Sequence, residues 1–183
     1  LATNERLRLH VNKTPSLPQD GAAWASAFND LQPALNVAQR AGGGFFEIWT
    51  KQGIYRTTTG TDRTATFTIP SGLRLYGGFS GSESALAERT LPAFFITAMS
   101  GSIGSSSATD NAYTVVDASN TGSSTLIDGF TISNGYNNSS GPSGGQGAGV
   151  KAINGSLTFR NTKFISNTSV NEGGAIYSSG GAP

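Results

Sequence analysis

Large apolar residues recur along this chain in short runs, and two of these runs return later at fixed offsets. Segment 147–151 matches segment 173–177 at an offset of 26 residues, and segment 127–132 matches segment 159–164 at an offset of 32. Unequal offsets of this size are typical of a coil that carries one loop of variable length in each turn. The pattern therefore predicts a stacked array, in which each unit buries its apolar face only against its neighbours.

The repeating units predict strands and exclude helical repeats. They hold short β-branched and aromatic runs separated by Gly, Asn and Ser, and none contains ten residues with helical apolar spacing. Asn and Gly suit the corners between strands, because both tolerate a left-handed backbone. We therefore predict an all-β domain folded as a right-handed parallel β-helix, a solenoid of short strands.

Two motifs of the last repeat carry a family resemblance. Phe-x-x-Asn at 164–167 and Gly-Gly-Ala-Ile at 173–176 resemble the repeats of chlamydial polymorphic outer-membrane proteins. From about His10 onward, the chain is similar to the large secreted bacterial β-helix proteins related to them. Three further segments carry this likeness: 30–35, 72–79 and 126–132. The resemblance implies the β-helix fold and a secreted or cell-surface location in a Gram-negative bacterium, but no particular reaction.

Residues 1–44 are predicted to form an N-terminal strand and a capping helix. The alternation at 7–11 predicts the opening strand, and Asn29 or Asp30 supplies the N-cap of a helix that ends at the glycines 42–44. One apolar face of this helix holds Leu31, Leu35 and Ala38. We expect the helix to cover the first coil, because the end of a solenoid otherwise exposes apolar surface and unpaired strand edges.

Residues 45–183 are predicted to form the coils, roughly six of them at the usual strand spacing. Four polar stretches interrupt the pattern, at 57–64, 81–98, 103–111 and 136–147. The last coil stops at a corner over 178–183, where the earlier copy continues into a strand at 157–159. We therefore expect an open end, which pairs with more of a longer parent chain or with another copy of the protein.

Composition excludes several classes of function. The net charge is +1 and there is no basic run, so nothing favours nucleic-acid binding. No apolar run approaches the ~20 residues of a transmembrane segment. The lack of cysteine is compatible with bacterial export, and we expect the signal peptide to be already removed, so that residue 1 follows a cleavage site.

Carboxylates are the main catalytic candidates, because one histidine and no cysteine leave little for a nucleophilic triad. His10 is expected to be a partly exposed strand residue. Asp110, Asp117 and Asp128 lie in consecutive segments that could stack on one side, and Lys151 and Arg160 follow them.

Two kinds of polysaccharide-cleaving enzyme of the pectate-lyase-like β-helix type would use such groups. A glycoside hydrolase needs two carboxyl groups ~5–10 Å apart, whereas a lyase uses carboxylates to bind Ca²⁺ and a base to remove a proton. In that case Asp117, Asp128, Lys151 and Arg160 are the catalytic candidates, and Asp110 and Asp117 are the weak calcium candidates. The simpler alternative is that Asp117 and Asp128 cap backbone N–H groups at corners.

The hypothesis that we favour from sequence is a non-catalytic exported domain, which builds an adhesive or self-assembling surface structure or begins a longer adhesin. Such a domain needs no cofactor, and Ca²⁺ is the one ion that the sequence leaves as a candidate ligand. A third hypothesis is a carbohydrate-binding module that binds glycans through an exposed loop aromatic, for which Tyr136 is the best candidate.

Overall fold

The computed structural model describes residues 5–14, 19–90, 96–105, 107–141 and 144–181. Parts of the polar stretches at 81–98, 103–111 and 136–147, and of the corner expected at 178–183, lie outside these residues. Strands dominate the described chain, and its longest helix has 10 residues. None of the helices in this part combines the length and the apolar character that crossing a membrane requires.

All paired strands run parallel, and most of them form three sheets. Sheet A holds β1 (Leu7–Val11), β2 (Phe46–Lys51), β5 (Arg74–Phe79), β8 (Leu126–Asp128) and β12 (Thr158–Arg160). Sheet B holds β3 (Gly53–Arg56), β6 (Thr97–Ser100), β9 (Thr131–Ser133) and β13 (Lys163–Ile165). Sheet C holds β4 (Phe67–Thr68), β7 (Val116–Asp117), β11 (Val150–Ile153) and β15 (Ile176–Ser179), and β10 (Tyr136–Asn137) pairs separately with β14 (Thr168–Ser169).

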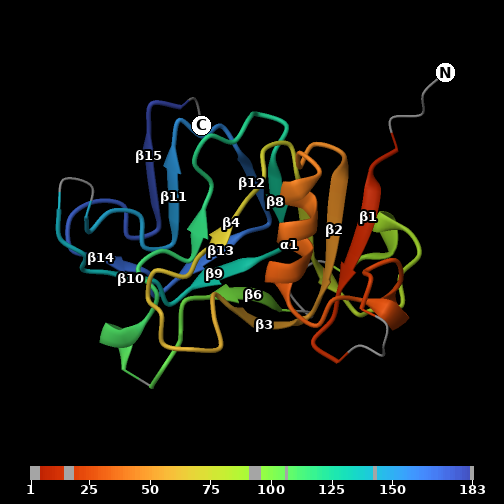
Figure 1. Cartoon of the computed structure of the whole chain (residues 1–183), viewed down its shortest axis with the longest axis horizontal. Coiled ribbons are helices and arrows are strands. Elements are labelled where there is room, and N and C mark those ends of the chain that lie inside the picture. The colour runs from red at the N-terminus through yellow and green to blue at the C-terminus, as the bar shows by residue number, and fades with distance from the viewer. Residues whose placement is uncertain (1–4, 15–18, 91–95, 106, 142–143, 182–183) are drawn as a thin grey trace.

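The chain visits the three sheets in the same order four times. From β2 onward it passes through sheets A, B and C in turn, and each new strand pairs with the strand one turn earlier (Figure 1). The two sequence offsets are confirmed as registers, because Val150 lies opposite Ile176 and Ile127 lies opposite Phe159. Equivalent positions in successive turns therefore lie directly against one another.

Each sheet contributes one inward row of large side chains to a common core. The row of sheet A is Leu9, Ile48, Leu75, Ile127 and Phe159. The row of sheet B is Tyr55, Met99, Ile132 and Phe164, and that of sheet C is Phe67, Val116, Val150 and Ile176. The three rows pack into one apolar cluster in the first turns, whereas Phe159 and Phe164 at the last turn are only partly buried.

Left-handed corner residues also stack from turn to turn. Asn120, Asn154 and Gly180 all have positive φ, and each follows the sheet C strand of its own turn. The backbone N–H of Asn120 donates to the Ile153 carbonyl at 2.8 Å, and that of Asn154 donates to the Ser179 carbonyl at 2.7 Å. The prediction that Asn and Gly occupy the corners is thereby confirmed at this edge of the stack.

The N-terminal helix begins where the sequence indicates. After a short 3₁₀ turn, η1 (Trp24–Ser26), helix α1 spans Leu31–Arg40, and the Asp30 carboxylate accepts the Leu31 N–H at 2.7 Å as N-cap. The buried face of α1 consists of Leu31, Ala34, Leu35 and Ala38, which belong to the same apolar cluster as the sheets. The helix contacts β1, β2 and β4.

Two expectations about the strands are corrected. Sheet A has five strands in the described chain, fewer than the roughly six turns expected, because the long segments between β5 and β7 use more residues per turn. Strand β6 lies where the sequence indicated an interruption, and two 3₁₀ turns, η2 (Leu86–Glu88) and η3 (Ala108–Asp110), flank it.

We expect the inward rows to carry most of the stability of the stack. Leu75→Ala removes a side chain that is 0% exposed, so it should lower the free energy of unfolding by about 2–5 kcal/mol. Ile54→Ala is the matched control, because Ile54 is 52% exposed on β3 and should change that free energy by about 0.5 kcal/mol or less. Urea denaturation followed by circular dichroism measures both, and equal losses would contradict the assignment of inward and outward faces.

Candidate functional site

Asp117 and Lys151 are one of two pairs of candidate catalytic residues that the strand register brings together, the other being Asp128 and Arg160. Asp117 and Lys151 lie directly opposite each other on β7 and β11, on the outward side of sheet C. Both line a cavity of about 230 Å³, together with Tyr113, Asn137 and hydroxyl side chains. The Asp117 carboxylate also accepts the backbone N–H of Ser119 at 2.9 Å, which is the capping role that the simpler alternative gave it.

Asp128 lies in a different sheet and has a different role. It stands opposite Arg160 in sheet A, but its carboxylate accepts from Arg89 Nη2 at 3.0 Å and from Asn161 Nδ2 at 2.9 Å. The side chains of Asp128 and Arg89 are each only 8% exposed. Asp128 therefore does not cap a corner as expected, because it is the acceptor of a buried ion pair.

The expectation that Asp110, Asp117 and Asp128 stack on one side is wrong. Asp117 and Asp128 lie in separate sheets, and Asp110 ends the 3₁₀ turn η3, where its carboxylate accepts the backbone N–H of Ser105 at 2.8 Å. No three His, Asp or Glu side chains converge into a metal-binding group in the part of the chain that the structure describes. The cavity beside Asp117 thus holds one carboxylate, whereas glycoside hydrolysis requires two.

Tyr136 does not lie in an exposed loop, contrary to the sequence-based expectation. It belongs to strand β10 and is only partly exposed. The Arg63 guanidinium lies 6.0 Å from its ring and donates to its carbonyl at 2.8 Å. Tyr136 is therefore not the freely exposed loop aromatic that the carbohydrate-binding hypothesis requires.

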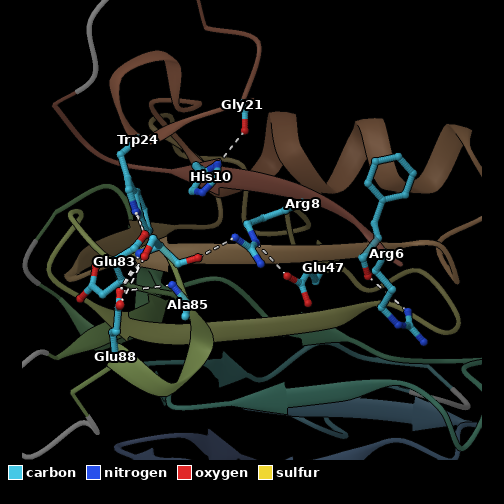
Figure 2. A network of polar contacts seen from close by, with 11 residues as sticks. Arg6, Arg8, His10, Gly21, Trp24, Glu47, Glu83, Ala85 and Glu88 are labelled. Atoms are coloured by element: carbon cyan, nitrogen blue, oxygen red, sulfur yellow. Dashed lines mark hydrogen bonds and ion pairs between the residues drawn. The ribbon is translucent and has the colours of Figure 1, made fainter. Parts of the chain in front are cut away.

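The outward face of sheet A begins with an aromatic and charged network that sequence reasoning missed (Figure 2). The Arg8 guanidinium lies 3.6 Å from the Trp49 ring and donates to Glu47 at 2.9 Å. Figure 2 shows the loop that carries Glu83 and Glu88 closing over this end of the sheet, where Trp24 Nε1 donates to the Glu83 carbonyl at 2.9 Å. The Glu83 carboxylate accepts three backbone N–H groups of its own loop, so its oxygens are engaged within that loop.

His10 is buried in this network, where the sequence indicated a partly exposed residue. Its side chain lies between Trp24 and Trp49, with ring centroids 4.7 and 6.0 Å away. Nδ1 is 3.0 Å from the Gly21 carbonyl oxygen, which can only accept, so Nδ1 carries the proton of the neutral ring. Burial lowers the pKa of His10 below its ordinary value, although the Gly21 carbonyl opposes this shift.

The last turn presents a second candidate site, the end face formed by β12, β13 and β15. Each of these strands pairs on one side only, with β8, β9 and β11 respectively, in the residues that the structure describes. The inward residues of this turn are incompletely covered: Ile176 is 39% exposed, and the rings of Phe159 and Phe164 pack edge-on at 5.4 Å. The end face therefore combines free backbone hydrogen-bonding groups with exposed core side chains.

We expect the Arg89–Asp128 pair to be a stabilising pair. Arg89→Ala leaves the Asp128 carboxylate buried without its cation and should lower the free energy of unfolding by about 3–5 kcal/mol. Arg160→Ala removes an exposed cation beside the same carboxylate and should change it by about 0.5 kcal/mol or less. Equal effects in urea denaturation would contradict the assignment of Asp128 to Arg89.

His10 should make the protein less stable as the pH falls below about 6.5. Because the folded-state pKa is lowered, the unfolded chain binds a proton in this range before the folded chain does, so the free energy of unfolding decreases. His10→Gln should flatten the dependence just below pH 6.5. Backbone hydrogen bonds from Ser84 and Ala85 lower the pKa of Glu88, so its contribution is lost only at lower pH. An unchanged slope near pH 6 in the variant would contradict the role of His10.

Comparison with known proteins identifies no relative of this chain. No family model, no curated protein and no solved structure matches the chain. The resemblance carried by the motifs at 164–167 and 173–176 therefore stays a prediction.

Proposed function

We propose that this chain is a right-handed parallel β-helix with a helical N-terminal cap, and that it serves as a non-catalytic structural or adhesive domain exported to the cell surface. The repeated passage through sheets A, B and C around one apolar cluster supports the β-helix. Right-handedness follows from the strong preference of crossovers between parallel strands of one sheet. The low share of charged residues and the absence of cysteine are compatible with export.

The packing of α1 supports its role as a cap. Its buried face joins the same cluster as Leu9 and Ile48, the first inward residues of sheet A. The helix also contacts β4, the first strand of sheet C, and so precedes that sheet in the stack. A helix in this position covers the apolar surface that the first turn would otherwise expose.

The end face is the observation that carries the structural function. Free strand edges beside partly exposed core residues favour the addition of further parallel strands. The corners of the last turn have the same left-handed geometry as those before it, so a further turn of the same repeat fits the register. We assign the end face to additional coils of a longer parent chain. Head-to-tail association with another copy is less favourable, because α1 occupies the opposite end.

The separate positions of the described carboxylates favour a non-catalytic function. The cavity at Asp117 and Lys151 offers one carboxylate and one ammonium, and Asp128 is held by Arg89 in another sheet. Glu5 and Glu47 line one cavity beside sheet A, but Glu47 is paired there with Arg8 at 2.9 Å. The outward surface can therefore display and bind ligands without the constellation that glycoside hydrolysis needs.

We expect the native chain to be longer than the 183 residues of this sequence. Denaturing mass spectrometry of protein from its natural source should give a mass well above 18.8 kDa. Ile176→Ala should then lower the free energy of unfolding by about 2–5 kcal/mol in the longer chain and by less in the 183-residue chain, because an added turn buries Ile176.

Ile165 is the matched control, since it points outward on β13 and is 49% exposed. Ile165→Ala should have a small effect in both chains. A native monomer of 18.8 kDa would overturn the assignment of the end face to a longer chain. Release of new reducing ends from a polysaccharide by the purified protein would overturn the non-catalytic function.

A further inference from the structure

Two outward rows of side chains on sheet A bring more arginines than carboxylates together. In one row Arg8, Glu47 and Arg74 lie opposite one another on β1, β2 and β5. In the other row Asp128 on β8 lies opposite Arg160 on β12. Each carboxylate therefore has an arginine of the same row on an adjacent strand.

Glu47 and Asp128 each form an ion pair with one arginine, and neither partner is Arg74 or Arg160. Glu47 accepts from Arg8, and Asp128 accepts from Arg89, which comes from the loop after β5. Arg74 and Arg160 are exposed and form no ion pair or side-chain hydrogen bond with any residue that the structure describes. The same face therefore presents two guanidinium groups whose donors are available.

Arg74 and Arg160 line one cavity. Its volume is about 190 Å³, and hydroxyl groups of Ser123, Ser124 and Thr158 lie on its wall with Tyr76. All three hydroxyl residues are exposed, and they come from β12 and from the turn that precedes β8. The strands β5 and β12 are two positions apart in sheet A, a separation of about 10 Å.

The positive charge of Arg74 also acts on the neighbouring side chain of Arg6. Burial lowers the pKa of Arg6, and the positive charge of Arg74 lowers it further. Arg6 donates to the backbone carbonyls of Gly44 and Gly72 at 2.6 Å, which holds its guanidinium close to the start of β5, where Arg74 lies. An anion bound at Arg74 would relieve this repulsion.

We propose that the Arg74–Arg160 cavity binds an acidic sugar unit of a polysaccharide, through a carboxylate or sulfate on the sugar. A planar guanidinium donates two parallel hydrogen bonds to such an oxyanion, and the serine and threonine hydroxyls suit the sugar's own hydroxyl groups. A lipid surface is not favoured, because Leu126 is the one aliphatic side chain among the lining residues. The inference rests on the proposed adhesive function, for which it names the ligand class.

Binding to three immobilised glycans tests the assignment. Polygalacturonate and dextran sulfate should bind the wild-type protein and neutral dextran should not, with affinity falling as salt is added. Arg74→Gln and Arg160→Gln should each weaken binding by about tenfold or more. Arg74→Lys should restore it only in part, because an ammonium lacks the bidentate fork.

Matched controls separate the cavity from general surface charge. Arg56→Gln removes an arginine from β3 in sheet B and should leave glycan affinity unchanged. Urea denaturation should show that Arg74→Gln and Arg160→Gln retain wild-type stability, since both side chains are exposed. The site would be overturned if Arg56→Gln weakened glycan binding as much as Arg74→Gln and Arg160→Gln do. It would also be overturned if the double variant Arg74→Gln/Arg160→Gln still bound both acidic glycans with wild-type affinity.

The nature of the ligand is read from two further probes. Free sulfate should not compete at the concentration of anionic groups at which polygalacturonate does, because it makes no hydroxyl contacts. Binding of polyglutamate as tight as that of polygalacturonate would overturn the assignment to a sugar. Reducing ends measured in the same samples report on the non-catalytic function separately, so either proposal can fail without the other.

Discussion

The structure depends on in-register stacking between successive parallel turns. A two-residue or three-residue strand such as β4 or β8 cannot bury its inward side chain alone, so burial requires an equivalent residue in the next turn. The inward rows show the result: Ile48, Leu75 and Ile127 are fully buried, whereas the last turn is partly open. Stability and exposure in this chain are therefore set by the position of a turn in the stack.

The same constraint explains which parts of the fold the sequence predicts. Stacked positions require similar residues, so the offsets of 26 and 32 residues give the register of the last two turns. The helix is predicted well because Asp30 and its apolar spacing are local signals. Strand β6 is not, because the segment Thr97–Ser100 has one large apolar residue, Met99, and its conformation is fixed by pairing with β3 and β9.

The outward face is less predictable because its partners come from outside the repeat. Asp128 is a strand residue of the repeat, but Arg89 reaches it from a segment between two strands, and no sequence spacing indicates that contact. Asp117 and Lys151 are brought together by the register itself, so a correct alignment of turns predicts them. The positions of Arg74 and Arg160 on sheet A follow from the register of the turns. Their lack of ion-pair partners among the described residues does not, because Arg8 and Arg89 pair with the carboxylates Glu47 and Asp128 instead.

The two tryptophans lie together at one end of the molecule. Trp49 stacks on Phe79 at 4.6 Å, and the Trp24 ring lies 5.5 Å from the same phenylalanine. These are the only tryptophans in the chain, so indole fluorescence reports on the first turns alone. In a stack whose turns open separately, fraying at the far end leaves that emission unchanged. An unchanged fluorescence spectrum thus shows that the N-terminal part of this protein is folded and gives no information on the later turns.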